Sequence, residues 1–262
     1  MKIVVCIKQV PATTEVSIDP ETKRLVREGV EIMMNPFDTY ALEEGLLLRE
    51  AHGGEVIAIS MGPKRTEATL REALACGADR AILLNDRVLG GSDTFATSYA
   101  LSRAIAKIGN VDLVITGKQA VDGDTAQVGP GIAAHLGWPQ AAYVSRVIES
   151  DSKHLVLERM HETGYDVCSL ELPGVITVLK DINSPRVPTL KGRLASRKAS
   201  INIWNASAIS ADLTKIGLNG SPTRVVATRS PDARDKHTII LDGSPEESAR
   251  ELVKILKQRI KL

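Results

Sequence analysis

The sequence has few aromatic residues and few cysteines, and each shortage excludes a class of structure. Aromatic residues make up 3% of the 262 residues and hydrophobic residues 43%, so a core of useful size must be mainly aliphatic. The cysteines Cys6, Cys76 and Cys168 are widely spaced, without a Cys-x-x-Cys pair. Their small number and wide spacing predict reduced, buried thiols in a reducing compartment rather than a disulfide framework.

An excess of charge and a long hydrophobic run are also missing. Lys and Arg number 33 and Asp and Glu 32, so the net charge of +1 creates no field that attracts nucleic acid or a membrane surface. The apolar run at residues 3–7 is too short for a signal-peptide core, and no run approaches the ~20 residues of a membrane span. We therefore expect a cytoplasmic protein without a membrane span.

Signatures of catalysis and metal binding are absent from the sequence. There is no Gly-x-x-x-x-Gly-Lys-Ser/Thr, His-Glu-x-x-His or Gly-x-Ser-x-Gly, and the five histidines are scattered. We predict no metal site and no catalytic acid, base or nucleophile, which suits a protein whose cofactor carries the reaction.

Two further patterns resemble known sites without satisfying them. Residues 129–134 match Gly-x-Gly-x-x-Ala, but the first glycine does not directly follow a strand and Pro130 fills a variable position, so a standard dinucleotide fingerprint is not predicted. The basic cluster in residues 191–198 has no interleaved aromatic residue. It favours a solvated arm or a protein interface over nucleic-acid binding.

The first half of the chain alternates strands with helices. Apolar runs predict strands at residues 3–7, 56–60, 81–84 and 113–116. Asn35-Pro36 predicts a helix start, and Ser92 is the expected cap of a helix that carries an apolar stripe. The fold class is therefore α/β, a doubly wound and mostly parallel sheet whose ligands bind beyond the carboxyl ends of the strands.

The pattern changes in the second half. Residues 143–148, 155–160, 166–172 and 175–179 predict strands without intervening helices, either antiparallel or as an extension of the sheet. Residues 183–198 predict a loop or arm. Ser244-Pro245-Glu246-Glu247 predicts a capped terminal helix whose apolar stripe packs on its own domain or on a partner, which spacing alone does not decide. We divide the chain into a nucleotide-binding domain, residues 1–182, and an arm, residues 183–262.

The most informative stretch follows the strand at residues 113–116. A glycine-rich loop between a strand and a helix offers free N–H groups and a positive helix end, both suited to a pyrophosphate. Thr125 and Gln127 can add side-chain hydrogen bonds, whereas Asp122 and Asp124 suit ribose hydroxyls, loop architecture or helix capping. The loop residues are Gly117, Lys118, Gln119, Ala120, Val121, Asp122, Gly123, Asp124, Thr125, Ala126, Gln127 and Val128.

Six stretches, in order along nearly the whole chain, resemble the beta subunit of electron-transferring flavoproteins. They are residues 3–10, 34–37, 77–79, 112–120, 138–140 and 188–190. The resemblance implies a heterodimer with a larger alpha subunit that carries a redox-active FAD, an acyl-CoA or similar dehydrogenase as partner, and an adenine nucleotide in this chain. Positions matched to that nucleotide are Cys6, Asn35, Ala58, Met61 and the loop from Gly117 to Val128.

The resemblance also implies two interface positions. Phe37 matches a residue that approaches the alpha-subunit flavin, and Leu190 matches the loop that anchors the dehydrogenase. The family's aromatic companion to Phe37 falls at Thr13, so one aromatic contact is missing.

Residues 92–97 and 121–130 look like the electron-bifurcating branch of this family. Thr94 and Thr97, one helical turn apart, can let a flavin approach and can bond its edge. We therefore favour FAD over AMP in this chain, hydride from NADH, and ferredoxin or flavodoxin as a low-potential acceptor. The alternatives are a non-bifurcating carrier with structural AMP, and a nucleotide-sensing or nucleotide-hydrolysing α/β protein of the ATP-binding or universal-stress type. The sequence leaves open whether the chain is an enzyme, and it is expected to act only within a complex.

Overall fold

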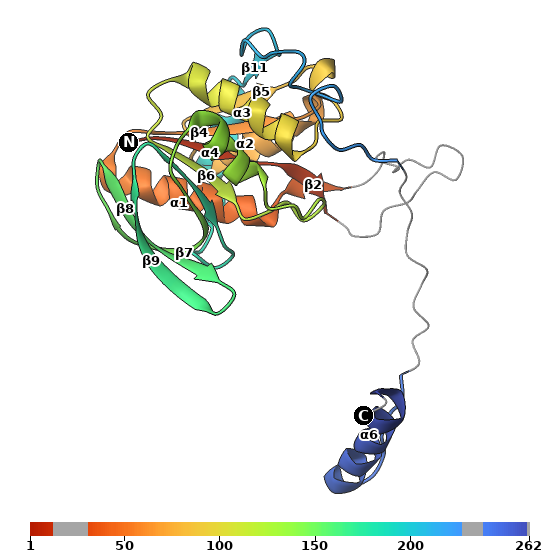
Figure 1. The fold of residues 1–262 in the computed structure, drawn as a ribbon. Coiled ribbons are helices and arrows are strands. Elements are labelled where there is room, and N and C mark those ends of the chain that lie inside the picture. The colour runs from red at the N-terminus through yellow and green to blue at the C-terminus, as the bar shows by residue number, and fades with distance from the viewer. Residues whose placement is uncertain (13–30, 227–237, 261–262) are drawn as a thin grey trace.

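The computed structural model describes residues 1–12, 31–226 and 238–260, and Figure 1 shows its fold. The strands are β1 (Lys2–Cys6), β2 (Gln9–Pro11), β3 (Ile32–Met34), β4 (Glu55–Met61), β5 (Arg80–Leu84), β6 (Leu113–Gly117), β7 (Gln140–Ser150), β8 (His154–His161), β9 (Gly164–Glu171), β10 (Gly174–Val178) and β11 (Asn202–Trp204). The helices are α1 (Pro36–His52), α2 (Glu67–Cys76), α3 (Thr94–Ile108), α4 (Val128–Leu136), α5 (Leu190–Lys198) and α6 (Pro245–Ile260), with short 3₁₀ turns η1 (Lys64–Thr66) and η2 (Arg87–Leu89).

The main sheet has nine strands in the order β11-β5-β4-β1-β6-β10-β7-β8-β9. The strands from β11 to β7 pair in parallel, and β8 and β9 continue the sheet antiparallel. The chain runs outward from β1 to β4 and β5, and α3 then returns it to β6 on the other side of β1. The strand order therefore switches between β1 and β6, the place where open α/β sheets bind ligands.

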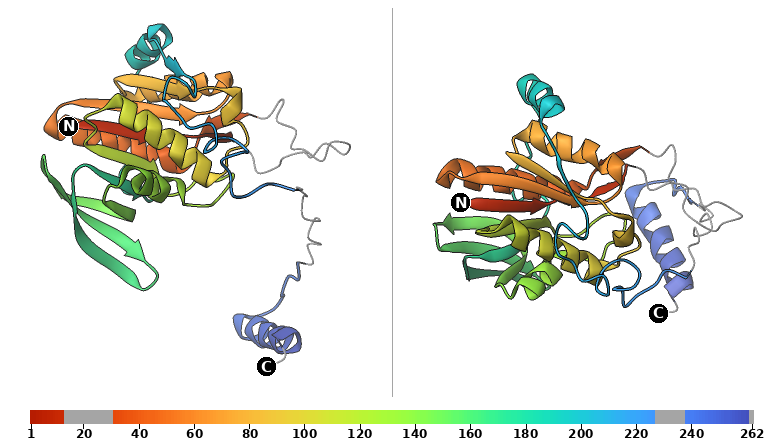
Figure 2. Two further views of the ribbon diagram at one scale, coloured as in Figure 1. Left: turned by 45° about the horizontal axis from the view of Figure 1, so that its top comes forward. Right: turned by 90° about the horizontal axis from the view of Figure 1, so that it is seen from above.

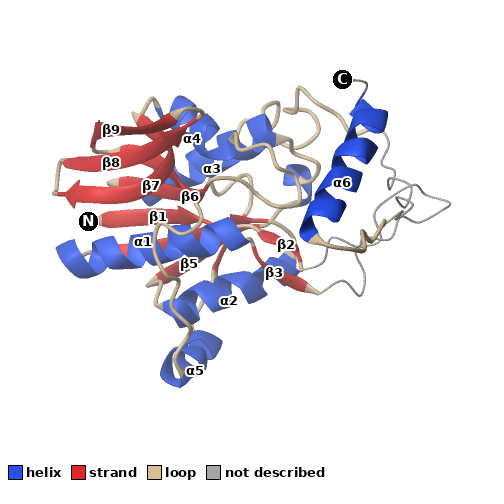
Figure 3. Cartoon of the chain, turned by 90° about the horizontal axis from the view of Figure 1, so that it is seen from below, coloured by secondary structure: helices blue, strands red, loops and turns tan. Residues whose placement is uncertain are grey.

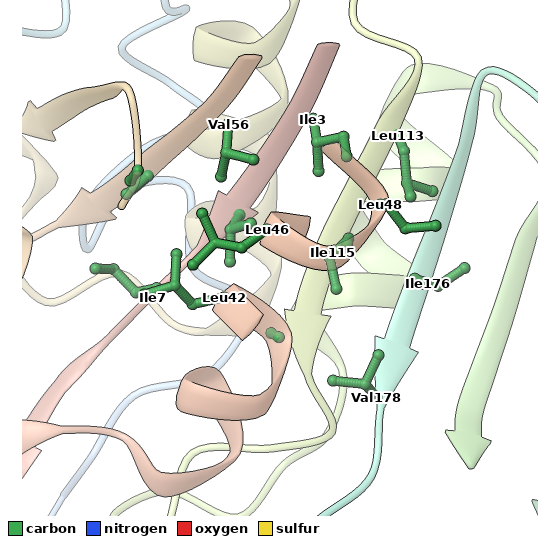
Figure 4. Packing of buried hydrophobic residues seen from close by; sticks show 14 of the residues in the cluster. Ile3, Ile7, Leu42, Leu46, Leu48, Val56, Leu113, Ile115, Ile176 and Val178 are labelled. Carbon is green, nitrogen blue, oxygen red and sulfur yellow. The ribbon is translucent and has the colours of Figure 1, made fainter. Parts of the chain in front are cut away.

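Helices cover both faces of this sheet (Figures 1 and 3). The core under α1 and α2 contains Ile3 and Val5, whereas the core under α3 and α4 contains Val4 and Cys6. Successive residues of a strand point to opposite faces, so a strand covered on both sides must be apolar at every position. Figure 4 shows the first of these cores, where Leu46 of α1 lies among side chains from the neighbouring strands.

This arrangement confirms the predicted α/β class and the strand–helix alternation of the first half. One predicted cap was wrong by a residue, because the carboxylate of Asp93, not Ser92, accepts from the N–H of Ala96 at 3.1 Å. Ser92 instead donates to the carbonyl of Leu89 and accepts from the N–H of Gly217.

The strands of the second half divide between two roles. β8 and β9 form the antiparallel extension, but β7 and β10 are parallel members of the main sheet. Every residue of β10 is buried. The continuous apolar run of a doubly covered strand therefore explains why β10 lies inside the sheet, beside β6.

The prediction of a loop for the whole of residues 183–198 was wrong, because residues 190–198 form α5. Thr189 caps this helix by accepting from the N–H of Gly192, and Gly192 lies so close to the carbonyl of Ala75 in α2 that a Cβ would not fit. Arg71 of α2 donates to the carbonyl of Ser196. Tertiary contacts with α2 thus stabilise a helix that lacks an apolar period, and β11 then pairs with β5 at the sheet edge.

The terminal helix α6 begins as its sequence predicts. The N–H of Ser244 donates to the carboxylate of Glu247 at 2.8 Å, and the N–H of Glu247 donates to the hydroxyl of Ser244 at 3.3 Å, a capping box. Figures 1 and 2 show α6 apart from the sheet and its helices. In the described ranges, no helix combines the length and hydrophobicity that crossing a bilayer requires.

Candidate nucleotide-binding site

The candidate site lies at the switch point, where β1 and β6 end side by side. Cys6 pairs with Thr116 at these ends, and Cys6 also pairs with Ile59 of β4. The side chain of Cys6 is 8% exposed, and burial raises the pKa of its thiol well above the usual range. Cys6 therefore presents a neutral surface, which suits contact with an uncharged part of a ligand.

Asn35 joins the start of α1 to the loop after β6. Its side-chain nitrogen donates to the carbonyl of Gln119 at 2.8 Å, and its side-chain oxygen accepts from the N–H of Val121 at 3.1 Å. Because both groups of the amide are used, the 1% exposed side chain is fully satisfied. Asn35 thus shapes the predicted loop from inside the protein.

The loop is also stabilised by its own charged side chains. Lys8, just beyond β1, donates to the carboxylate of Asp122 at 2.6 Å. The side-chain nitrogen of Gln119 donates to the carboxylate of Asp124. Of the three roles predicted for Asp122 and Asp124, these contacts are those of loop architecture.

The end of the loop presents unpaired hydrogen-bond donors. Asp124 and Ala126 have positive φ values, 53° and 54°, a geometry found in concave anion-binding turns. The N–H groups from Thr125 to Val128 donate to no atom of the described part of the chain. These groups lie where α4 begins, so N–H dipoles and the positive end of the helix coincide.

Two glycines let α4 approach the sheet and α3. A Cβ on Gly129 would lie 2.5 Å from Thr177 and 2.8 Å from the hydroxyl of Thr116, and one on Gly131 would lie 2.5 Å from the hydroxyl of Ser98. The Gly-Pro-Gly pattern is therefore explained by close packing of a helix against a strand and a second helix. This packing places the start of α4 next to the first turns of α3.

Thr94 and Thr97 lie in those first turns of α3, on the same helix face as the buried Leu101. Both side chains are half-buried, and neither hydroxyl bonds to any described residue. Phe95 packs edge-on against His135 of α4, with ring centroids 5.1 Å apart. Half-buried hydroxyls without a described hydrogen-bond partner therefore lie beside the junction of α3 and α4.

The structure brings most of the predicted nucleotide residues together, but not all. Met61 ends β4 and packs on the same side of the sheet as Cys6. Ala58 is fully buried in the opposite core, under α1 and α2, so its side chain does not lie with the other predicted nucleotide-binding residues.

One family model matches this chain. Its description is "Electron transfer flavoprotein domain", and it covers residues 22–209, well over half of the sequence. The chain belongs to the beta-subunit family of electron transfer flavoproteins.

Curated relatives match the chain along nearly its whole length. The electron transfer flavoprotein subunit beta of Thermoanaerobacterium thermosaccharolyticum is 48% identical over 260 residues, which are 99% of each chain. Protein FixA of Sinorhizobium fredii is 47% identical over 263 residues, 97% of this chain and 92% of the relative. A protein of Acetobacterium woodii named "Caffeyl-CoA reductase-Etf complex subunit CarD" is 44% identical over 260 residues, 99% of each chain.

The two predicted interface residues of this flavoprotein subunit lie on different helices. Phe37 is the second residue of α1, and a Cβ on Gly117 would lie only 2.6 Å from the Cβ of Phe37. Leu190 begins α5 and is 74% exposed, with Leu194 one turn further along at 52%. Thr13, the position of the missing aromatic residue, lies outside the described residues.

Ion pairs connect the segment before α5 to α1. The guanidinium of Arg186 donates to both carboxylate oxygens of Glu43, at 2.8 Å and 2.9 Å, and to Glu50 at 2.6 Å. These bonds raise the pKa of Arg186 and lower that of Glu50. A bidentate pair of this kind fixes geometry as well as charge. It therefore holds the segment that leads to Leu190 against α1.

Asp38, Lys8 and Arg186 were not predicted as site residues from the sequence. Asp38 is 5% exposed, and burial raises its pKa to about 7 against the opposing effect of bonds from Asn35 and Lys8. An acidic residue three positions after Asn35, on the apolar side of a helix start, was a usable signal for Asp38.

Among the described residues, no group of three or more His, Cys, Asp or Glu side chains could hold a metal ion.

Proposed function

We propose that this chain binds FAD at the switch point between β1 and β6. In this proposal it is the subunit of an electron-bifurcating flavoprotein that accepts hydride from NADH. The supporting observation is the row of unpaired N–H groups from Thr125 to Val128 at the start of α4, beside the free hydroxyls of Thr94 and Thr97. The first group suits a pyrophosphate and the second suits the edge of a flavin ring. AMP would use only the first, so the hydroxyls favour FAD.

The residues divide the work of binding in this proposal. The loop N–H groups hold the phosphates, Cys6 and Met61 line the adenosine end, and Thr94 and Thr97 border the flavin. Bound FAD would supply hydride acceptance from NADH and one-electron transfer onward. No side chain is needed as an acid or base; the chain must align the two rings at roughly 3–3.5 Å and exclude water.

The proposed partners follow from the family and from the surfaces of the arm. An alpha subunit with its own FAD would receive one electron and pass it to an acyl-CoA or similar dehydrogenase, while ferredoxin or flavodoxin would take the other. The name of the Acetobacterium relative supports a reductase complex of this kind. We propose that residues 1–182 bind the nucleotide and that residues 183–262 bind partners, although β11 of the second part pairs with the main sheet.

Counting nucleotides tests the proposed function. The heterodimer, purified with its alpha subunit, should release two FAD on denaturation, and anaerobic NADH should bleach the flavin absorbance. In a Thr94→Val/Thr97→Val variant the hydroxyls are lost at nearly constant volume, so FAD in this chain should bind at least ~10-fold more weakly. Ser102→Ala, which removes a hydroxyl bonded to the carbonyl of Tyr99 further along α3, is the matched control. One FAD with one AMP, and no bleaching by NADH, would make the chain a non-bifurcating carrier.

Leu190 provides a separate test of the dehydrogenase partner. Truncation to alanine should slow electron delivery to the physiological dehydrogenase by about 10-fold, because exposed apolar anchors contribute more than 1 kcal/mol to many interfaces. Flavin content and NADH oxidation should not change, since Leu190 is an exposed residue of α5 and is not among the residues proposed to bind the nucleotide. Leu213→Ala removes another exposed leucine, 61% accessible, and should have no effect. Equal rates for Leu190→Ala and the unaltered chain would disprove this contact.

A further inference from the structure

Asp38 is a buried carboxylate at the meeting point of three segments. Its oxygen Oδ2 accepts from the N–H of Lys8 at 2.7 Å, just beyond β1, and Oδ1 accepts from the side chain of Asn35 at 2.9 Å. Gly117, at the end of β6, lies in close contact with Oδ1. One carboxylate thus receives donors from just beyond β1 and from the start of α1, and it packs against the first residue of the nucleotide loop.

The contact with Gly117 is unusually close. A Cβ at this position would overlap Oδ1 of Asp38 and lie 2.6 Å from the Cβ of Phe37. The bond from Asn35 extends the connection, because the same amide bonds Gln119 and Val121. Asp38 therefore reaches the loop both directly, through Gly117, and indirectly, through Asn35.

We propose that Asp38 is a positioning residue that holds residues 117–121 in the conformation of this structure, here called closed. This conformation is the one needed for nucleotide binding. This inference rests on the proposed nucleotide site but concerns a residue that has no predicted contact with the nucleotide. Without the carboxylate, the N–H of Lys8 and the side-chain amide of Asn35 would each lose a buried acceptor. Each such loss costs about 1–3 kcal/mol, so the loop would open toward water.

The charge of Asp38 gives the closed loop a pH dependence of defined sign. Burial raises the pKa of Asp38 from 3.8 to about 7 in the closed state, and a water-exposed Asp38 would return toward 3.8. Closure therefore binds a proton, so it is favoured below pH 7 and weakened as the pH rises through 7. Between pH 6 and pH 8 these two pKa values predict that the closing equilibrium falls by about 10-fold.

The other ionisable groups around Asp38 leave this sign unchanged. Lys8 faces it from beyond β1 and stabilises the ionised form, but its ammonium is also paired with Asp122. Cys6 faces it from β1, and its raised pKa keeps the thiol neutral through this range. Asp38 is therefore the group whose charge changes near pH 7.

Hydrogen exchange measured by mass spectrometry on the full-length chain, co-purified with its alpha subunit, tests this role. In an Asp38→Ala variant, protection of peptides covering residues 117–121 should fall by at least ~10-fold. In the unaltered protein, protection factors for the same peptides should fall by about 10-fold from pH 6 to pH 8, and this pH dependence should vanish in the variant. Glu44→Ala is the control: Glu44 is also a buried carboxylate on α1 with a raised pKa, but it accepts from Asn183 of the arm.

Affinity for the probes AMP and FAD, measured on the same samples, separates the two proposals. Weaker binding together with the loss of protection supports both. Loss of protection with unchanged affinity supports the role of Asp38 and overturns the nucleotide site at this loop. Unchanged protection in Asp38→Ala overturns the role of Asp38, and if that variant does not fold, a flat pH profile of the unaltered protein does so.

Discussion

Replacing Leu252 and Leu256 of α6 by glutamate should weaken association with the alpha subunit by at least ~100-fold, because burying their remaining apolar surface contributes about 3 kcal/mol and a buried charge opposes it. The two leucines and Val253 form an apolar stripe that is 42–50% exposed. Figure 1 shows no part of the sheet domain over this helix. The sequence alone left open whether α6 packs on its own domain or on a partner, and we predict that its stripe docks on the alpha subunit.

The matched control for this prediction lies on the opposite face of the same helix. Glu251 and Lys254 form a surface ion pair at 3.7 Å, and pairs of this kind contribute about 0–1 kcal/mol. A Glu251→Ala/Lys254→Ala variant should therefore bind the alpha subunit almost normally. The dissociation constant is measured by surface plasmon resonance, and deletion of residues 244–262 should reproduce the effect of the glutamates. The docking role is wrong if the truncated chain keeps its full affinity while its melting temperature is unchanged.

Short sequence patterns predicted several parts of the fold: the strand β1, the start of α6 and the loop after β6. The apolar run of β1 follows from burial on both faces, and the start of α6 follows from Ser244 and Glu247, three residues apart. The loop after β6 was predicted from its glycines and its place between a strand and a helix. In each case the pattern that marks the element lies within a few consecutive residues, so it is visible in sequence.

Contacts between distant segments decided what the sequence could not show. α5 exists because Arg71 and Ala75 of α2 meet residues more than a hundred positions later. Asp38 became part of the site only when the fold brought Lys8 and Gly117 to it. Ala58 shows the converse, since its match to the family placed it at the nucleotide, whereas the alternation of β4 turns its side chain into the opposite core.

Gly117→Ala should be the most damaging single substitution in the candidate site. Its Cβ would lie 2.8 Å from the carbonyl carbon of Phe37, and backbone atoms cannot rotate away as a side chain can. The end of β6 and the start of α1 would have to separate, which is overpacking with a cost of about 2–3 kcal/mol. For a chain of this size, that cost lowers the melting temperature by roughly 5–10 °C.

The same separation should also affect ligand binding, because it breaks the bonds from Asn35 to Gln119 and Val121. Affinity for FAD, measured by calorimetry, should fall by at least ~10-fold as two buried hydrogen bonds are lost. Gly123→Ala provides the control within the same loop, since a Cβ there meets nothing within 4 Å. If both variants melt and bind alike, close approach at Gly117 does not position the loop. If Gly117→Ala alone loses stability and affinity, the junction of α1 with β6 is what holds the nucleotide loop in its binding conformation.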